Sequence, residues 1–169
     1  MATERIQALI ADDYTADLGE RDLDDLRAMR DECHALETSI SYYRRLAQGR
    51  IEILDAWTQR DGDDASVESL VADLPRILAG EAGRSPNANT RFAEAAPDIV
   101  ELDFGGRERV VSDETLANLT VLSPDELAQS LADLRAFERE LSELRRGLHS
   151  SIDEIEHEIA TRQAADAVG

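Results

Sequence analysis

Hydrophobic positions form a regular seam in the first half of the chain. From about residue 22 to residue 60, the seam positions alternate spacings of three and four without a break. These positions are Leu26, Met29, Cys33, Leu36, Ile40, Tyr43, Ala47, Arg50, Leu54 and Trp57. The pattern predicts one long helix with an apolar stripe, which needs a partner because a lone helix in water is marginally stable.

A second long helix is predicted near the end of the chain and has a clear start. Ser123, Pro124 and Glu126 supply an N-cap, a proline at the first helical position and a capping-box glutamate. Its apolar stripe consists of Leu127, Leu131, Leu134, Phe137, Leu141, Leu144, Leu148, Ile152, Ile155 and Ile159. Each helix can cover the other, so we predict an all-α fold with an intramolecular antiparallel coiled coil. A parallel pair would need a crossover along the whole rod, and dimerisation stays open.

The segment between the two long helices has a weaker pattern. A short helix is predicted from Ser66 to Leu78, with Ser66 as its N-cap, Gly80 as its terminator and Pro75 limiting its regularity. Apolar and polar residues then alternate over 100–104. This alternation leaves a small hairpin open, although two strands alone are rarely stable.

The pattern divides the chain into four parts. These are an N-terminal arm (1–20), the first long helix with the first motif (21–60), a connecting segment with a short helix and irregular structure (61–122), and the second long helix with the second motif (123–165). The arm contains a short apolar stretch followed by acidic and small residues, which fits a short helix, a flexible arm or a docking segment.

Composition restricts the possible functions. The formal net charge of -19 opposes binding to a nucleic-acid polymer, so no direct DNA binding is expected. A small anionic ligand stays possible, because a few arginines can reverse the field locally. The single cysteine, Cys33, excludes an intramolecular disulfide, and its seam position predicts a packed, inert thiol.

No feature of a membrane protein or an enzyme is visible. The chain has no apolar run of roughly 20 residues and its start lacks a signal-peptide pattern, so we expect a cytoplasmic protein with no membrane partner. Phosphate-binding loops, catalytic triads and metal-ligand spacings are also missing. The sequence therefore predicts a protein that is not an enzyme, with no catalytic residue, metal site or cofactor.

One polar motif, E-x3-S-x2-R-x3-Q/H-x3-E/D, occurs once on each long helix. The first copy is Glu37, Ser41, Arg44, Gln48 and Glu52, and the second copy is Glu138, Ser142, Arg145, His149 and Asp153. At about 100° per residue, these offsets span roughly 80° of one helix face. Each motif residue directly follows a seam residue, so both stripes should lie along the edge of the helix interface. On antiparallel helices they would converge on one groove.

The residue types in the motif suit a guanine nucleotide. Arginine forks onto guanine O6 and N7 or onto phosphate, and a carboxylate accepts from guanine N1–H and N2–H. Polar residues beside a heptad seam are also ordinary helix-supporting residues, and one copy alone would favour that interpretation. Two copies at the same position relative to the seam favour ligand binding. Each copy also carries a serine, which lowers helix stability and is therefore better explained by a binding role.

The motif residues resemble a known family. The stretch from Leu36 to Leu54 is similar to the RsiG-type anti-sigma factors of sporulating actinobacteria, whose cyclic di-GMP signature matches the paired motif. The resemblance covers both long helices and the short helix between them. It implies an antiparallel coiled coil that binds two molecules of cyclic di-GMP per chain, as a partly intercalated pair between the motif stripes. The loaded protein would then capture a WhiG-type sigma factor, which is a role in development.

Carried over residue by residue, this resemblance assigns ligand binding to matching positions in both copies. These are Glu37, Ser41, Arg44, Gln48, Glu138, Ser142, Arg145 and Asp153. Glu52 departs from the expected aspartate and extends the reach of its carboxylate. His149 replaces a glutamine and can change charge near neutral pH, so we expect ligand affinity to rise as pH falls toward about 6.

The leading hypothesis is a cyclic di-GMP-dependent anti-sigma factor. The alternative is a coiled-coil scaffold or adaptor protein without nucleotide binding, in which the two stripes only support the helices. Another alternative keeps the nucleotide but changes the partner to some other regulator.

Overall fold

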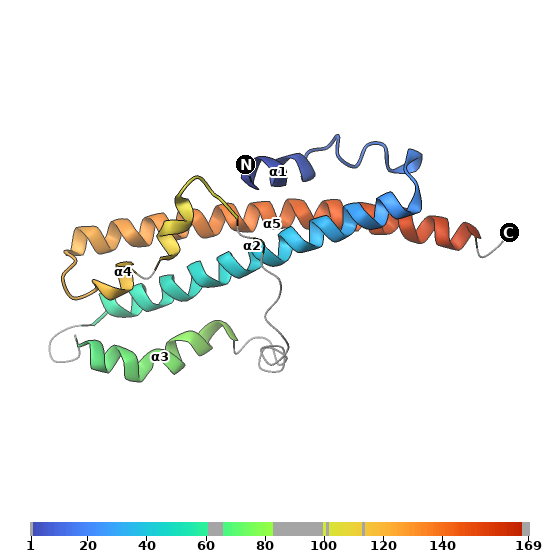
Figure 1. Cartoon of the computed structure of the whole chain (residues 1–169). Helices are drawn as coiled ribbons and strands as arrows, with labels where there is room; N and C mark the ends of the chain where they lie inside the picture. Colours follow the sequence, from blue (N-terminus) through green and yellow to red (C-terminus); the bar gives the residue numbers. More distant parts are fainter. Residues whose placement is uncertain (1, 61–65, 83–99, 101, 113, 167–169) are drawn as a thin grey trace. The chain divides into compact units, whose positions relative to one another are not determined.

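The structure of the chain, a computed structural model, describes residues 2–60, 66–82, 100, 102–112 and 114–166. Over these residues the regular structure is entirely helical, which confirms the predicted fold class. The helices are α1 (Ala2–Leu9), α2 (Leu23–Thr58), α3 (Val67–Ala82), α4 (Glu114–Ala117) and α5 (Pro124–Asp166), with 3-10 turns at Leu18–Glu20 and Arg107–Val111 (Figure 1). None of the described helices combines the length and hydropathy needed to cross a membrane.

Both long helices, α2 and α5, pass through two compact units. The first unit contains Met1–Tyr42, Asp98–Gly106 and Glu140–Gly169, and the second contains Tyr43–Pro97 and Arg107–Arg139. In the first unit, Glu37 pairs with Arg145 and the earlier residue His34 lies beside the later residue Glu156. In the second unit, Arg44 pairs with Glu138, and the later residue Asp55 pairs with the earlier residue Arg135. The two helices therefore run antiparallel within each unit, as predicted.

The two predicted seams form most of the core. All ten stripe residues of α5, from Leu127 to Ile159, are buried. Seven of the ten α2 positions are also buried, whereas Tyr43, Arg50 and Trp57 are half-buried. Arg50 departs from the seam because its guanidinium is polar, and its Nε donates to the Ser112 carbonyl oxygen at 3.4 Å.

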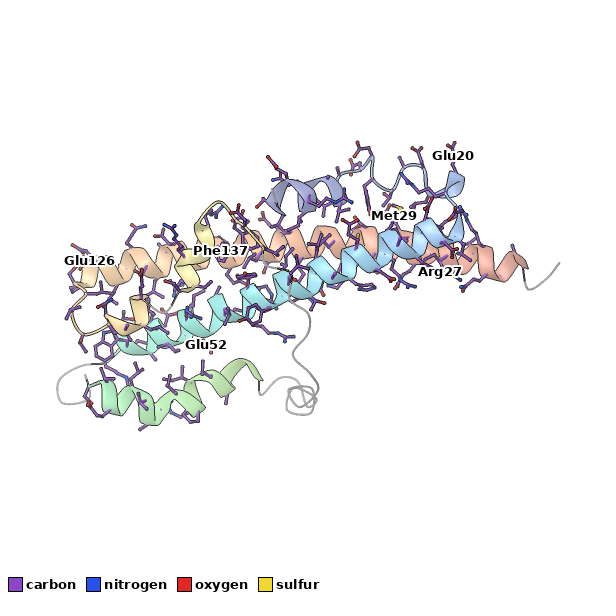
Figure 2. The ribbon with its side chains drawn as sticks, viewed as in Figure 1. Glu20, Arg27, Met29, Glu52, Glu126 and Phe137 are labelled. Atoms are coloured by element: carbon purple, nitrogen blue, oxygen red, sulfur yellow. The ribbon has the colours of Figure 1, made fainter. Side chains whose placement is uncertain are left out.

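The beginning of α5 follows the predicted capping box. The Ser123 amide donates to the Glu126 carboxylate at 2.8 Å, and the Glu126 amide donates to Ser123 Oγ at 3.3 Å. The Ser123 amide and hydroxyl lower the pKa of Glu126, which Figure 2 shows at the start of the helix. Two orphan groups at the helix start are thus satisfied by each other's side chains.

Helix α3 begins as predicted but ends later. The Ser69 amide donates to Ser66 Oγ at 3.1 Å, which confirms the N-cap. The predicted stop at Gly80 is wrong, because the helix continues through this glycine to Ala82. An isolated glycine costs a helix only about 1 kcal/mol, so it does not force an end. Arg60 anchors the start of α3 by donating to Ser69 Oγ at 2.6 Å and to Asp73 at 2.7 Å.

Within the first unit, the N-terminal arm is docked on α5. Its α1 helix buries Ile6 and Leu9 completely, and Ser151 donates to the Leu9 carbonyl oxygen at 2.8 Å. Arg162 donates to the carbonyl oxygens of Leu18 and Arg21. Of the possibilities left open by the sequence, the structure therefore has a short helix docked on α5 rather than a flexible arm.

The arm occupies the edge of α5 opposite the motif. Gly147 and Ser151 each lie directly before a seam residue, whereas the motif residues each lie directly after one. At about 100° per residue, these two positions are about 160° apart around the helix. A Cβ atom on Gly147 would lie 2.9 Å from the Ile10 side chain, so only glycine permits this close approach. The arm consequently leaves the motif edge of α5 uncovered.

The hairpin that the alternation left open does not form in the described part of the connecting segment. The Val100 amide instead donates to Ser39 Oγ on α2 at 3.0 Å. The side chains of Leu102 and Phe104 are buried, and a 3-10 turn occupies Arg107–Val111. A helix side chain therefore satisfies a backbone donor that a hairpin would have paired with a second strand.

Candidate functional site

The ten motif residues all lie on α2 and α5, and most are partly shielded from water. Eight are half-buried: Glu37, Ser41, Arg44, Gln48, Glu52, Glu138, Ser142 and Arg145. His149 and Asp153, both near the end of the second copy, are exposed. This placement follows from the register, because a residue directly after a seam residue lies at the rim of the interface.

In the first unit, four motif residues form a compact group, which we call the Glu37 cluster. The Glu37 Oε1 atom accepts a hydrogen bond from Arg145 Nε at 2.8 Å and one from Ser41 Oγ at 2.8 Å. His149 Nε2 lies 3.3 Å from the same oxygen. Only 16% of the Glu37 side chain is exposed, so this carboxylate depends on protein donors more than on water.

Electrostatics favour the charged form of Glu37. Burial by itself would raise the pKa of this carboxyl group. Hydrogen bonds from Arg145 and Ser41, and the charges of Arg145 and His149, outweigh burial and lower the pKa overall. The Glu37 cluster therefore holds a carboxylate that stays ionised at neutral pH despite its limited contact with water.

In the second unit, three motif residues form the Glu138 cluster. The Glu138 Oε1 atom accepts from Gln48 Nε2 at 3.2 Å and from Arg44 Nη1 at 3.4 Å. Both contacts are longer than the hydrogen bonds at Glu37. The Nε atom of Arg44 is buried and has no hydrogen-bond acceptor among the described residues. The Glu138 cluster thus contains a guanidinium with unused donor capacity.

The two clusters share one design, which we call the crossed exchange. In each cluster, a carboxylate from one motif copy contacts the arginine of the other copy. Glu37 of the first copy takes Arg145 and His149 from the second, while Glu138 of the second takes Arg44 and Gln48 from the first. The carboxylate, the arginine and the amide or imidazole each have an equivalent in the other cluster, as expected for repeated motifs on antiparallel helices.

The remaining motif residues have less defined roles. Glu52 is half-buried on α2, where Figure 2 labels it. The carbonyl oxygen of Ser142 accepts from Arg146 Nε at 3.3 Å. Asp153 is exposed on α5, four residues after His149.

A comparison with known protein families adds an independent observation. The family model described as RsiG-like matches residues 12–78 and 113–168, which include α2, α5, both motif copies and α3 as far as Leu78. The chain belongs to the RsiG-like family. This is a family of anti-sigma factor regulators, and a sigma factor is the class of partner that it implies. No curated protein matches the chain.

Two other kinds of candidate site in this RsiG-like protein, a reactive thiol and a metal site, can be assessed from the structure. Cys33 is completely buried, and burial raises the pKa of its thiol more than the hydrogen bond with Tyr14 lowers it. This confirms the predicted packed thiol and disfavours the reactive thiolate. Within the described residues, no group of three histidine, cysteine or acidic side chains is arranged to hold a metal ion.

Sequence reasoning missed the residues that dock the arm and the connecting segment onto the long helices. Ser39 and Ser151 are buried, and each bonds to the backbone of a distant segment. Both serines, like Gly147, directly precede a seam residue. A small residue directly before a seam residue could have indicated these docking positions, because it marks the edge of the seam where another backbone can approach closely.

Proposed function

We propose that this RsiG-like protein binds cyclic di-GMP through its two motif copies and, once loaded, sequesters a WhiG-type sigma factor from RNA polymerase. The crossed exchange is the observation that carries this proposal. It assembles a carboxylate, an arginine and an amide or imidazole in each unit. These are the groups that complement a guanine base.

Guanine can replace the crossed exchange without leaving either ionic partner unsatisfied. Its N1–H and N2–H groups donate to a carboxylate, and its O6 and N7 atoms accept from an arginine fork. One guanine base would therefore replace the ion pair within a cluster, either Glu37 with Arg145 or Glu138 with Arg44. Adenine fits this arrangement of a carboxylate and an arginine poorly, because it has no O6 acceptor and no N2–H donor.

The degree of burial supports a ligand site rather than a purely solvated surface. The Arg44 side chain is 25% exposed and the Glu138 side chain is 21% exposed, so their contacts are partly protected from screening by salt. Charge-assisted hydrogen bonds in such surroundings are stronger than at a fully exposed surface. The buried Arg44 Nε supplies a donor that the described protein groups do not use.

Net charge restricts the ligand to a small one. A total of -19 repels a polyanion, whereas cyclic di-GMP has only two phosphates and can be balanced by a few arginines. This supports regulation through a sigma factor and not through direct DNA binding. As the family resemblance implies, two molecules would bind per chain as a partly intercalated pair.

A coiled-coil scaffold is the competing hypothesis, and one observation favours it. The same crossed contacts are ion pairs between two helices, like those that flank the seam of ordinary coiled coils. In that case the motif would stabilise the helix pair and specify its register, with no nucleotide involved.

Calorimetric titration with cyclic di-GMP separates the two hypotheses. The wild-type chain should bind about two ligands, as the resemblance implies, and both Arg44→Ala and Arg145→Ala should lose binding. Cyclic di-AMP is the matched ligand control and should give no heat. Purified chain should then retain a WhiG-type sigma factor on a column only when cyclic di-GMP is present. Absence of binding both alone and with that sigma factor would favour the scaffold.

A further inference from the structure

Helix α3 carries an exposed apolar stripe. Among the described residues, six large apolar side chains are exposed, and three of them lie on this one helix. They are Val67 (40% exposed), Val71 (56%) and Leu78 (42%). At about 100° per residue, these three positions fall within about 40° around the helix, so their side chains share one face. We call this face the outer stripe.

The outer stripe is distinct from the face by which α3 packs within its unit. Leu70 is buried, and Leu74 and Ile77 on the same side of the helix are half-buried. The centre of this inner stripe lies about 70° around the helix from the centre of the outer stripe. A helix on a protein surface usually turns polar residues to water, so a second apolar stripe is typical of a helix that another surface covers.

Within the second unit, α3 runs antiparallel along the later part of α2 (Figure 1). Arg60, which follows α2, donates to side chains in the first half of α3. Near the other end of α3, the Leu78 side chain would lie 3.7 Å from a Cβ atom on Gly49. Gly49 directly follows Gln48, which belongs to the Glu138 cluster. The outer stripe therefore reaches α2 one residue from this cluster.

We propose that the outer stripe of α3 is a docking surface for the sigma factor that the loaded protein captures. This inference rests on the proposed function and names the surface that its partner contacts. Because the stripe ends one residue from the Glu138 cluster, one partner domain can cover both α3 and a nucleotide bound at that cluster. The nucleotide then completes the interface, which makes capture depend on the ligand.

The size of the outer stripe favours this partner over a second copy of the chain. A stable protein interface buries about 800 Å² per partner. Three side chains that are each about half exposed offer much less, so two outer stripes in contact would not hold a dimer. A partner that also contacts the nucleotide gains the additional area.

Charge and the family match favour the same partner. Two copies of a chain with a net charge of -19 repel each other, whereas a sigma factor binds DNA and therefore exposes basic side chains. The match to the RsiG-like family model extends as far as Leu78, so it includes the whole outer stripe. The stripe thus lies in the region shared with a family whose implied partner is a sigma factor.

The test uses a double variant of the full chain, Val67→Gln with Val71→Gln. Glutamine is a better helix former than valine and both positions are exposed, so α3 should stay folded. Calorimetric titration with a WhiG-type sigma factor, at saturating cyclic di-GMP, should show about tenfold weaker binding, because the complex loses apolar burial. Binding of cyclic di-GMP without the sigma factor should match the wild type.

Two controls match this change. Val67→Ile with Val71→Ile keeps the outer stripe apolar and should bind the sigma factor like the wild type. Val121→Gln makes the same polar change at a valine that is 76% exposed and lies outside α3 in the same unit. It should also bind like the wild type.

Wild-type affinity of the double variant for the sigma factor would disprove the docking surface while the proposed function stood. Equal losses in Val121→Gln, or a loss of cyclic di-GMP binding in the double variant, would overturn the inference as well. A wild-type dimer that the double variant abolishes, measured by sedimentation, would assign the stripe to a second copy instead. If the wild type captured the sigma factor without cyclic di-GMP, the proposed ligand dependence would fail, yet weaker capture by the double variant would still identify the surface. No capture by the wild type under either condition would overturn both.

Discussion

The Glu37 cluster and the Glu138 cluster make the same exchange with different tightness. Glu37 accepts two hydrogen bonds of 2.8 Å and has His149 at 3.3 Å. Glu138 accepts from Gln48 at 3.2 Å and from Arg44 at 3.4 Å, and both contacts are longer than those two hydrogen bonds of Glu37. One cluster thus has a well-satisfied carboxylate, while the other has a loosely held arginine with a buried, unused Nε.

This difference in contact length affects two properties separately: the stability of the folded protein and the access of a ligand to the side chains. A short, charge-assisted hydrogen bond between helices stabilises the folded protein, but a ligand must break it before using either partner. A long contact stabilises less and is replaced at lower cost. We therefore expect the Glu37 cluster to contribute more to the helix pair and the Glu138 cluster to be the more accessible to a base.

The largest expected effect is the loss of ligand binding in Arg44→Ala and Arg145→Ala. Each variant should bind cyclic di-GMP at least about 100-fold more weakly, because the arginine would supply charge-assisted hydrogen bonds to the bound ligand, and a 100-fold loss corresponds to about 3 kcal/mol. Only Arg145→Ala should also reduce the free energy of unfolding. Calorimetry and urea unfolding of both variants measure the two effects. Equal destabilisation by the two changes would contradict the comparison.

A smaller difference is expected in the coupling energies of the two ion pairs. A double-mutant cycle of Glu37→Gln and Arg145→Gln should give about 1 kcal/mol, since both side chains are partly exposed and screened. The matched cycle of Glu138→Gln and Arg44→Gln should give less than about 0.5 kcal/mol. Urea unfolding at neutral pH supplies all the values. A larger coupling at Glu138 would reverse the order of tightness.

Acid should remove the advantage of the Glu37 cluster. The pKa of Glu37 is lowered below its ordinary value of 4.5, so its stabilising contribution is present above that value and is lost as pH falls through the folded-state pKa. Glu37→Gln should therefore destabilise the protein by about 0.5–1 kcal/mol at pH near 7 and by less in acid.

Carboxyl NMR provides the direct check of this pH effect. Ser41→Ala removes one of the two hydrogen-bond donors that lower the pKa of Glu37, so the pKa should rise in this variant. A Glu37 pKa that Ser41→Ala leaves unchanged would show that Arg145 and His149 alone hold the carboxylate in its charged form.

The smallest expected effect concerns His149, the residue that differs most between the clusters. Protonated His149 adds a cation near the proposed ligand, and Glu37 beside it already shares its charge with Arg145. Affinity for cyclic di-GMP should rise about twofold to threefold between about pH 8 and pH 6. His149→Gln should abolish this slope, while Gln48→His should introduce one at the Glu138 cluster. A flat affinity of the wild type over this pH range, or the opposite trend, would contradict this prediction.

The helix pair was predictable because its signals are local and periodic. The stripe from Leu127 to Ile159 is buried at every position, and the Ser123–Glu126 capping box is formed. The Arg50 side chain was harder to place, because its partner Ser112 is 62 positions away. The sequence likewise contains no local sign that Ser39 bonds to the Val100 amide, so the sequence alone does not exclude the hairpin.

The motif residues could also be predicted from the sequence, but which glutamate contacts which arginine could not. Spacing placed Glu37 and Arg44 on one helix face, which suggests that they act together along one stripe. The structure instead pairs Glu37 with Arg145, because the facing side chain of the other helix is closer than a residue seven positions along the same helix. Contacts between helices depend on their axial register, which spacing within one helix does not specify.

The crossed exchange also has an evolutionary consequence. Because each carboxylate depends on an arginine from the other motif copy, neither copy can diverge alone. Positions 37 and 145 should change together among relatives, and so should positions 44 and 138, whereas 37 and 44 should vary more independently.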